Sequence, residues 1–390
     1  MRHFLADKVV SIPPSGIRKF FDIVSEMPDA ISLGVGEPDF DTPWHIREEG
    51  IYSLERGRTF YTSNAGLKPL KVEICEYLKR RCGVVYDPDR EVLVSVGGSE
   101  AIDLAMRAMI NDGDEVLVPQ PSYVSYMPCV TLADGVPVVI QLEEKDQFRL
   151  TPEKLLEKIT DKTKILVLPF PNNPTGAIME REDLEKIVEI VLEKDLFVVS
   201  DEIYSELTYG DEPHVTIASF PGMKERTVLI NGFSKAYAMT GWRLGYAAAP
   251  AAILEQMLKI HQYAIMCAPT TSQYAAVSAL KNGDPDVAMM RESYNQRRRF
   301  LLHAFAEMGI ECFEPKGAFY TFPNIKRFGM TSEEFATRLL QEEKVAVVPG
   351  TAFGGCGEGF VRISYAYSLK NLKEALSRIE RFINRLDGKA

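Results

Sequence analysis

The sequence predicts an α/β protein with a large domain, built around a mostly parallel sheet covered on both faces, and a smaller α+β domain. Three observations lead to this prediction. The chain has 390 residues, which is too long for one small core. From about residue 90 onward, short β-branched runs alternate with helical patterns, as in parallel sheets. After about residue 250 the pattern changes to long helices, followed by a second region of strands and helices.

The strands of the large domain are predicted from short apolar runs between polar segments. They cover residues 92–96, 115–118, 137–142, 164–168, 196–200, 227–231 and 245–249. The run Ile165–Leu168 is apolar at every position, which fits a strand buried on both faces. Helical periodicity over residues 99–111 and 181–194 places helices between these strands, with a further helix expected after Pro121.

The part of the chain after about residue 250 is predicted to form long helices and then the smaller domain. Long helices are expected over residues 251–266, 271–280 and 286–308, then strands over 317–322 and 360–364, and a closing amphipathic helix over 369–386. The first 40 residues form no clear unit and are expected to pack with the C-terminal region. We therefore predict a large domain of residues 41–290 and a small domain of residues 1–40 and 291–390.

Composition and charge argue against several classes of protein. The balance of 45 basic and 55 acidic residues gives a formal net charge of −10, which disfavours nucleic acid or an anionic membrane as a partner. No apolar run approaches the length of a membrane span, and the first residues lack a signal-peptide pattern. The six cysteines and five histidines show no metal-ligand spacing, so no metal is expected. Scattered cysteines are typical of a cytoplasmic protein.

A glycine turn follows the first predicted strand of the large domain, in the segment Gly97–Glu100. Backbone N–H groups at such a strand–turn–helix junction can cradle a phosphate, helped by the helix dipole. Most glycine turns of this kind bind nothing, and the Glu100 side chain would have to point away from an anion.

Two further segments place polar groups at the carboxyl ends of strands, where open α/β sheets bind ligands. Asn173 follows a proline-rich turn after the strand at 164–168, and Asp201 directly follows the strand at 196–200. Each residue can also be explained without a ligand, Asn173 as part of a turn and Asp201 as a cap for the turn that follows. A buried carboxylate needs a cationic or N–H partner, which a protonated pyridine nitrogen would supply.

A lysine and an arginine follow the strand at 227–231. Lys235 lies among small and apolar residues, where desolvation would lower its pKa and favour the free amine needed for imine chemistry. Arg243 lies eight positions further on, and its planar guanidinium group has N–H donors that suit a phosphate. A lone lysine would be interpreted as a surface charge, but four such segments in this order disfavour that interpretation.

The chain resembles the class I/II aminotransferases, in particular the bacterial branch of aspartate-aminotransferase-like enzymes. The resemblance rests on Ser234-Lys235 with Gly241-Trp-Arg243, and on Asn173-Pro-Thr-Gly with Asp201 and Tyr204, and it runs from about Ile31 to Arg362. It implies a large domain of the fold type I of enzymes that depend on pyridoxal 5'-phosphate (PLP).

Carried onto the matching positions, the resemblance implies a role for each residue around the ring of the cofactor. Lys235 would form a Schiff base with PLP and act as the base for proton transfer. Asp201 would pair with the pyridine nitrogen and keep it protonated. Tyr204 and Asn173 resemble the donors to the phenolic oxygen, and Tyr123 matches the aromatic residue that stacks on the ring.

The resemblance also implies a phosphate site and a second subunit. The phosphate would be held by Ser234, Arg243 and the backbone of Gly98, Ser99 and Glu100. Tyr61 matches a tyrosine that reaches the phosphate from the neighbouring subunit, which implies a homodimer with shared active sites.

For the substrate, Arg362 resembles the arginine that grips the α-carboxylate as a bidentate pair, with help from the backbone at Gly36 and from Asn173. Some relatives that favour acidic substrates carry a lysine where Ser99 stands, so a preference for aspartate is in doubt. Aromatic, neutral and specialised amino acids stay open as substrates.

The sequence therefore predicts a PLP-dependent aminotransferase that moves an amino group between an L-amino acid and a 2-oxo acid. The nearest alternative is another PLP reaction on the same fold, such as β-elimination at a C–S bond or decarboxylation. A non-catalytic PLP-binding protein would not need Arg362. A dehydrogenase would need a glycine fingerprint that the first strand–helix turn lacks.

Overall fold

The computed structural model describes residues 4–14, 16, 27, 29–210 and 212–388. Its helices are α1 (Asp7–Val10), α3 (Trp44–Glu55), α4 (Lys68–Cys82), α5 (Gly97–Met109), α6 (Tyr126–Leu132), α7 (Pro152–Lys158), α8 (Arg181–Glu193), α9 (Ala251–Ala264), α10 (Thr270–Asn282), α11 (Asp284–Glu307), α12 (Ser332–Glu343) and α13 (Leu369–Leu386). Its strands are β1 (Ile31–Ser32), β2 (Val92–Ser95), β3 (Glu115–Gln120), β4 (Val136–Gln141), β5 (Thr163–Leu168), β6 (Phe197–Asp201), β7 (Thr227–Gly232), β8 (Gly245–Ala248), β9 (Tyr320–Thr321), β10 (Val345–Ala346), β11 (Val348–Pro349) and β12 (Val361–Ser364).

A seven-stranded sheet forms the centre of the larger region, with the strand order β2-β8-β7-β6-β5-β3-β4. Strand β8 runs antiparallel to both of its neighbours, β2 and β7, and the other pairs are parallel. All the strands predicted for this region are present, with ends that differ by a few residues. The prediction of a mostly parallel sheet is confirmed.

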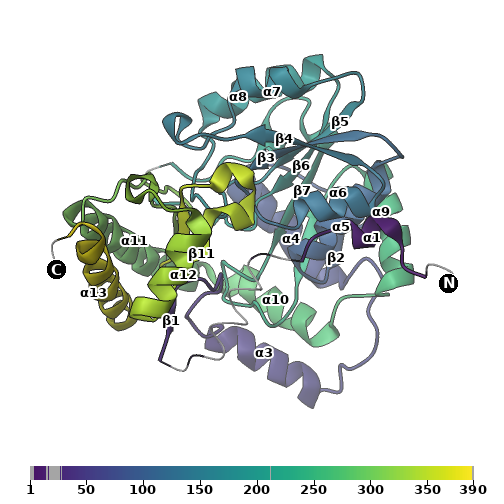
Figure 1. Cartoon of the computed structure of the whole chain (residues 1–390). Coiled ribbons are helices and arrows are strands. Elements are labelled where there is room, and N and C mark those ends of the chain that lie inside the picture. Colours follow the sequence, from purple (N-terminus) through teal and green to yellow (C-terminus); the bar gives the residue numbers. More distant parts are fainter. Residues whose placement is uncertain (1–3, 15, 17–26, 28, 211, 389–390) are drawn as a thin grey trace.

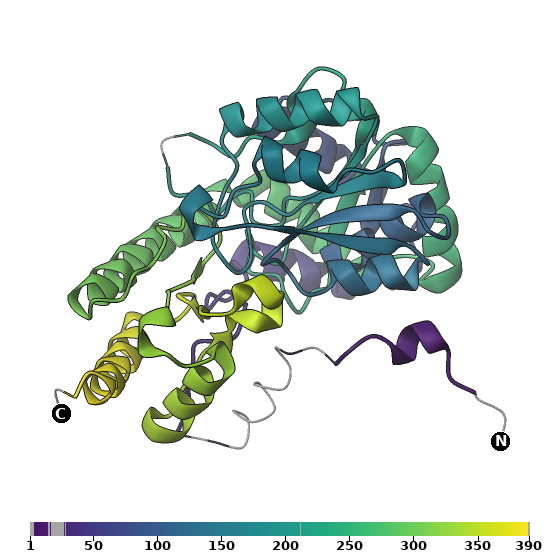
Figure 2. The ribbon, with the colours of Figure 1, turned by 45° about the horizontal axis from the view of Figure 1, so that its top comes forward.

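Side chains alternate between two buried faces along each strand, because successive residues point to opposite sides. Val116 and Val118 of β3 belong to a core cluster that includes residues of α5 and α9. Leu117, between them, belongs to a cluster with residues of α7 and α8. A third cluster joins β2, β7 and β8 to α4 and α10. The sheet is therefore covered on both faces, and Figure 2 shows helices on either side of it.

The C-terminal elements form a separate group beside this sheet. Figure 1 shows α11, α12 and α13 together at the left, away from β2–β7. Their core cluster takes in residues of β9, β10 and β12 and also Leu33. Ile31 pairs in parallel with Val345, so this part of the N-terminal segment contacts the C-terminal region. The domain boundaries at residues 40 and 290 stay a prediction, and part of the small-domain assignment (residues 1–3, 15, 17–26, 28 and 389–390) lies outside the described residues.

One predicted strand is shorter than expected. Residues 317–322 were expected to form it, but β9 covers only Tyr320–Thr321. The reason lies in the backbone: Ala318 has a left-handed φ of 57°, which interrupts an extended chain. The N–H of Gly317 donates to the carbonyl of Gly176 at 2.9 Å instead. The chain is thereby tied to the loop that follows β5.

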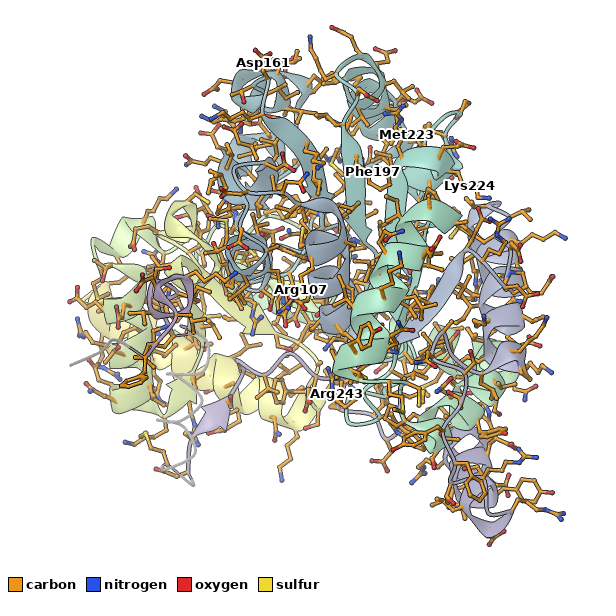
Figure 3. All side chains as sticks on the ribbon, turned by 90° about the vertical axis from the view of Figure 1, so that its right-hand side faces the viewer. Arg107, Asp161, Phe197, Met223, Lys224 and Arg243 are labelled. Carbon is orange, nitrogen blue, oxygen red and sulfur yellow. The ribbon has the colours of Figure 1, made fainter. Side chains whose placement is uncertain are left out.

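The carboxyl ends of the parallel strands meet at one end of the sheet. In Figure 3, Arg243 lies at the opposite end of the sheet from Phe197, the first residue of β6, and from Asp161, which precedes β5. Within the described part of the chain, no helix is long and apolar enough to cross a membrane.

Candidate active site

A cavity of about 450 Å³ opens at this end of the sheet, and its size suits a small ligand. Eleven of the thirteen residues predicted for the site line it: Gly36, Gly98, Ser99, Tyr123, Asn173, Asp201, Tyr204, Ser234, Lys235, Arg243 and Arg362. The two others, Glu100 and Tyr61, do not. Residues that are more than 300 positions apart in the sequence thus meet in one place.

Lys235 lies just after β7, at the centre of the cavity wall. Its Nζ donates a hydrogen bond to the carbonyl of Gly36 at 2.6 Å. Burial, together with the nearby charges of Arg362 and Arg243, lowers the pKa of Lys235 to about 8, against the opposing effects of Glu37 and Asp201. The neutral, nucleophilic form of this amine is therefore far more populated near neutral pH than that of an ordinary lysine, and it predominates above about pH 8.

Asp201 ends β6 and is 7% exposed. Its Oδ2 accepts a hydrogen bond from the Tyr126 hydroxyl at 2.7 Å, and its Oδ1 accepts one from the N–H of Ile203 at 3.2 Å. Burial raises the pKa of Asp201, and the two hydrogen bonds lower it in part. Both of these donors are neutral, so a cationic ligand atom would find an unpaired acid here.

Two tyrosines meet beside Lys235. The hydroxyls of Tyr204 and Tyr320 lie 2.8 Å apart, and their rings pack edge to face. Burial raises the pKa of Tyr204 well above its ordinary value, so the hydroxyl stays protonated and can donate. Tyr320 was not predicted for the site, although it lines the cavity.

The glycine turn Gly97–Gly98, which the structure places at the start of α5, lies tightly against β8. Gly97 has φ +76°, and a Cβ there would lie 2.8 Å from Nη2 of Arg243. A Cβ on Gly245 would lie 2.6 Å from the backbone of Gly97 and Gly98. Glycine is therefore required on both sides of this contact. Arg243 is held in place by a hydrogen bond from its Nη1 to the carbonyl of Thr240 at 3.1 Å.

Glu100 points away from the cavity. Its Oε2 accepts the N–H of Val96 at 2.5 Å, and its Oε1 lies 2.7 Å from Nδ1 of the buried His261. The wall near Gly98 and Ser99 thus keeps a surplus of donors, as a phosphate requires.

Arg362 approaches from β12 and is fully buried. Its Nη1 donates to Oδ1 of Asn173 at 2.8 Å, and its Nη2 donates to the carbonyl of Gly34. Its guanidinium lies 4.5 Å from the centre of the Tyr320 ring and 4.8 Å from that of Phe353. The Nε is buried with no hydrogen-bond partner among the described residues. The guanidinium is therefore fixed between aromatic rings, and its Nε still lacks a hydrogen-bond acceptor among the described residues.

Tyr61 lies outside the cavity and is 80% exposed, so within this chain it takes no part in the site. The unpredicted lining residues include Glu37, Tyr126 and Thr240 besides Tyr320. The sequence contains one reason to include Tyr126 in the site, since it lies three residues after Tyr123, at the start of a short helix. Nothing in the sequence marks Glu37, which lies in a segment without regular secondary structure.

The residues present fit PLP. A buried amine, a buried acid that forms no salt bridge among the described residues and a donor-rich glycine turn with an arginine match its aldehyde, its pyridine nitrogen and its phosphate. The unpaired donor on Arg362 fits the carboxylate of an amino acid.

Comparison with known proteins agrees with this chemistry. The family model "aminotransferase class I and II" matches residues 28–379. The chain is 52% identical to the putative aminotransferase YugH of Bacillus subtilis, over 99% of this chain and 100% of that protein. It is 47% identical to an aspartate aminotransferase of Pyrococcus abyssi, over 97% of this chain and 98% of that protein.

The structure is also similar to that of an aromatic aminotransferase from Pyrococcus horikoshii. The TM-score is 0.91 at 47% identity, and the match covers 94% of this chain and 99% of that one. The family prediction made from the sequence is confirmed: the chain belongs to the class I and II aminotransferases and is a PLP-dependent transaminase.

Proposed function

We propose that Lys235 is the residue to which PLP is covalently attached and the base that moves the proton during transamination. The observation that carries this proposal is the buried amine of Lys235, with its lowered pKa, between Asp201 and the glycine turn. When bound, PLP supplies an electron sink that weakens bonds at the amino acid's α-carbon. A neutral lysine at this place can accept and return the α-proton.

The residues around Lys235 orient the ring. Asp201 holds the proton on the pyridine nitrogen, because its carboxylate is buried and short of a cation. Tyr204 and Asn173 would donate hydrogen bonds to the phenolic oxygen, and Tyr123, which also lines the cavity, would stack on the ring. Asn173 still has its amide N–H groups for this purpose, since only its Oδ1 is used by Arg362.

The phosphate would be held by another group of donors that line the cavity: the backbone of Gly98 and Ser99, Ser234 and Arg243. Arg362 binds the substrate's α-carboxylate, with Gly36 beside it. We propose as substrates an L-amino acid and a 2-oxo acid, with aspartate and aromatic amino acids to be tested first, because relatives carry both names.

We further propose a homodimer in which Tyr61 completes the partner's site. Support comes from exposed aromatic and apolar side chains near this segment. The carbonyl of Phe60 accepts a hydrogen bond from Thr270, which brings residues 60–61 close to the chain that follows α9. The exposed large hydrophobic residues in this segment and at the end of α9 are Phe60, Tyr61, Tyr263, Ile265 and Met266. The six cysteines are free, which fits the cytoplasm as the location.

Chemical trapping tests the attachment site. Purified holoenzyme reduced with borohydride and digested is expected to carry the cofactor on the peptide that contains Lys235. Lys235→Ala should lose both the label and turnover, whereas it can still bind PLP without a covalent bond.

Lys71→Ala is a matched control for this experiment, because Lys71 is also buried and burial also lowers its pKa, but it lies on α4 outside the cavity. It should keep the label on Lys235. Label on another lysine in the wild-type protein would refute the assignment.

A mixing experiment tests the shared site. Lys235→Ala and Tyr61→Ala subunits, unfolded and refolded together, form hybrids in which one site carries both defects and the other carries neither. Recovery of activity above that of either variant alone supports the shared site. Activity equal to the mean of the two separate variants would contradict it.

A screen of amino donors against 2-oxoglutarate and pyruvate, with elimination products followed in the same samples, tests the reaction and narrows the substrates. No feature of the site or of the relatives' names favours the C–S lyase, so the expected product is a new amino acid with no released thiol.

A further inference from the structure

A buried histidine lies directly behind the proposed phosphate site. His261 is on α9, its side chain is fully buried, and α9 packs against α5. Its Nδ1 lies 2.7 Å from Oε1 of Glu100, and its Nε2 is buried without a partner among the described residues. Burying a polar atom without a hydrogen bond costs free energy, so the position of His261 calls for an explanation.

We assign Nδ1 of His261 as the donor and Oε1 of Glu100 as the acceptor of this contact, the pairing in which the Glu100 oxygens accept both of their hydrogen bonds. The other oxygen of Glu100 accepts the N–H of Val96, the residue before the glycine turn. Glu100 therefore has both oxygens occupied, one by the strand end and one by α9.

Without these contacts the Glu100 side chain could adopt another conformation. It lies in the first turn of α5, where free backbone N–H groups and the helix dipole attract a carboxylate. The nearest such groups are those of Gly98 and Ser99, which line the cavity. An acid that folded back onto them would compete with a phosphate for the same donors and would repel its charge.

We infer that His261 is a positioning residue, which holds Glu100 away from the glycine turn and so keeps the turn's N–H groups open for a phosphate. This inference rests on the proposed function of the turn. It predicts a defect in phosphate affinity that disappears when the acid is removed, which a merely structural histidine would not give.

The test measures binding to the full-length apoenzyme by calorimetry, with inorganic phosphate and PLP as the probes. His261→Leu removes the donor and is expected to raise both dissociation constants roughly 10-fold. The variant loses one charge-assisted hydrogen bond, and the freed Glu100 side chain then competes with the phosphate for the N–H groups of the turn. His261→Asn, which keeps an N–H donor near the position of Nδ1, should bind within about threefold of wild type.

The double variant His261→Leu/Glu100→Ala gives the sharpest result. With the acid gone, its affinity should return to within about threefold of that of Glu100→Ala alone. This variant also replaces a buried polar pair by apolar groups, so it is expected to fold even if His261→Leu does not.

Met257→Ala is the matched control. Met257 is fully buried one turn earlier on α9, in the core cluster that joins α5 and α9, and its side chain has no N–H or O–H to donate to Glu100. It should lower the unfolding temperature and leave phosphate affinity unchanged.

The inference is overturned if folded His261→Leu binds phosphate as wild type does, or if the double variant stays as weak as His261→Leu. Borohydride labelling of Lys235 in the wild type is a separate check: its failure would refute the proposed function, whatever the phosphate results.

Discussion

The two ends of the cavity are built in different ways. At the cofactor end, the groups follow closely on strands of one sheet: Asp201 ends β6, Lys235 follows β7, and the glycine turn follows β2. At the substrate end, Arg362 comes from β12, and it is held by Asn173 and by the carbonyl of Gly34. The first end depends on backbone geometry, and the second depends on contacts between distant parts of the chain.

This difference predicts how each end responds to change. A sheet holds its strand ends to one arrangement, so the cofactor end should change little when a single side chain is altered elsewhere. Arg362 depends on partners from three segments, so substrate binding should be sensitive to changes outside the sheet. The following experiments test this division, beginning with the largest expected effect.

Asp201→Ala should damage chemistry at the cofactor end most. Without the buried acid the pyridine nitrogen loses its partner, and kcat is expected to fall roughly 10³-fold. The dissociation constant of PLP should change far less, because the phosphate contacts stay. Steady-state kinetics and cofactor titration separate the two effects. Asp201→Glu, which keeps the charge, is the control, and a variant whose kcat stays within tenfold would contradict the assignment.

Arg362→Lys should affect the substrate end alone. An ammonium cannot form the bidentate pair or stack between the rings of Tyr320 and Phe353, so KM for the amino acid is expected to rise about 100-fold. The absorbance spectrum and the affinity of PLP should stay as in the wild type. A loss of PLP affinity of similar size would show that the two ends are not independent.

The buried Lys235 should make the stability of the cofactor-free protein depend on pH. Its pKa in the folded protein is about 8, below the ordinary value near 10.4 in the unfolded chain. Between these values the unfolded state binds more protons, so stability rises with pH from about 8 to 10 and is lowest below 8. Lys235→Met should be more stable than wild type at pH 7 by on the order of 2 kcal/mol.

Denaturant unfolding of both apoproteins from pH 7 to 10 measures this effect. The difference between wild type and Lys235→Met should shrink as the pH rises. A constant difference would mean that Lys235 titrates normally.

Gly97→Ala tests the cofactor end through its backbone. The new Cβ meets Arg243 and the residue has a left-handed φ, so PLP affinity is expected to fall about tenfold. KM for the amino acid, measured at saturating PLP, should stay the same. Gly57→Ala, which has a similar φ but no neighbour within 4 Å, controls for backbone strain alone.

Tyr320→Phe should have the smallest effect, but on both ends. It removes the hydroxyl that meets Tyr204 and keeps the ring under Arg362. A change of about threefold in kcat/KM is expected, since one neutral hydrogen bond is lost, with a shift in the pH profile of the cofactor's absorbance. An unchanged pH profile would mean that Tyr320 affects substrate binding only and not the cofactor.

The same division explains what the sequence allowed us to predict. Strand ends such as Asp201 and Lys235 carry a local signal, because an apolar run followed by a polar residue marks them. Arg362 was placed by family resemblance alone, since an arginine in a strand usually makes an ion pair. Tyr320 was missed because its contact with Tyr204 joins residues that are more than 100 positions apart, and no local pattern records such a contact.

Helix α3 was missed for a related reason. Its buried residues are Ile46, Gly50 and Ser53, while Trp44 and Leu54 are exposed, so the apolar residues do not follow the helical period. Helices that bury one continuous apolar face, such as α13, were predicted with their bounds. The Asp201–Tyr126 and Arg362–Asn173 contacts appear only in the folded chain.

The reversed strand β8 has a consequence for how long the cofactor stays bound. Because β8 returns beside β7, with Gly232 paired to Gly245, the segment between them leaves and re-enters the sheet at one place. That single loop carries both Lys235 and Arg243. Once water has hydrolysed the C=N bond to Lys235, we therefore expect PLP to leave only when this loop opens as one unit. The rate of that second step should then follow the rate at which the backbone amides of the loop exchange with solvent.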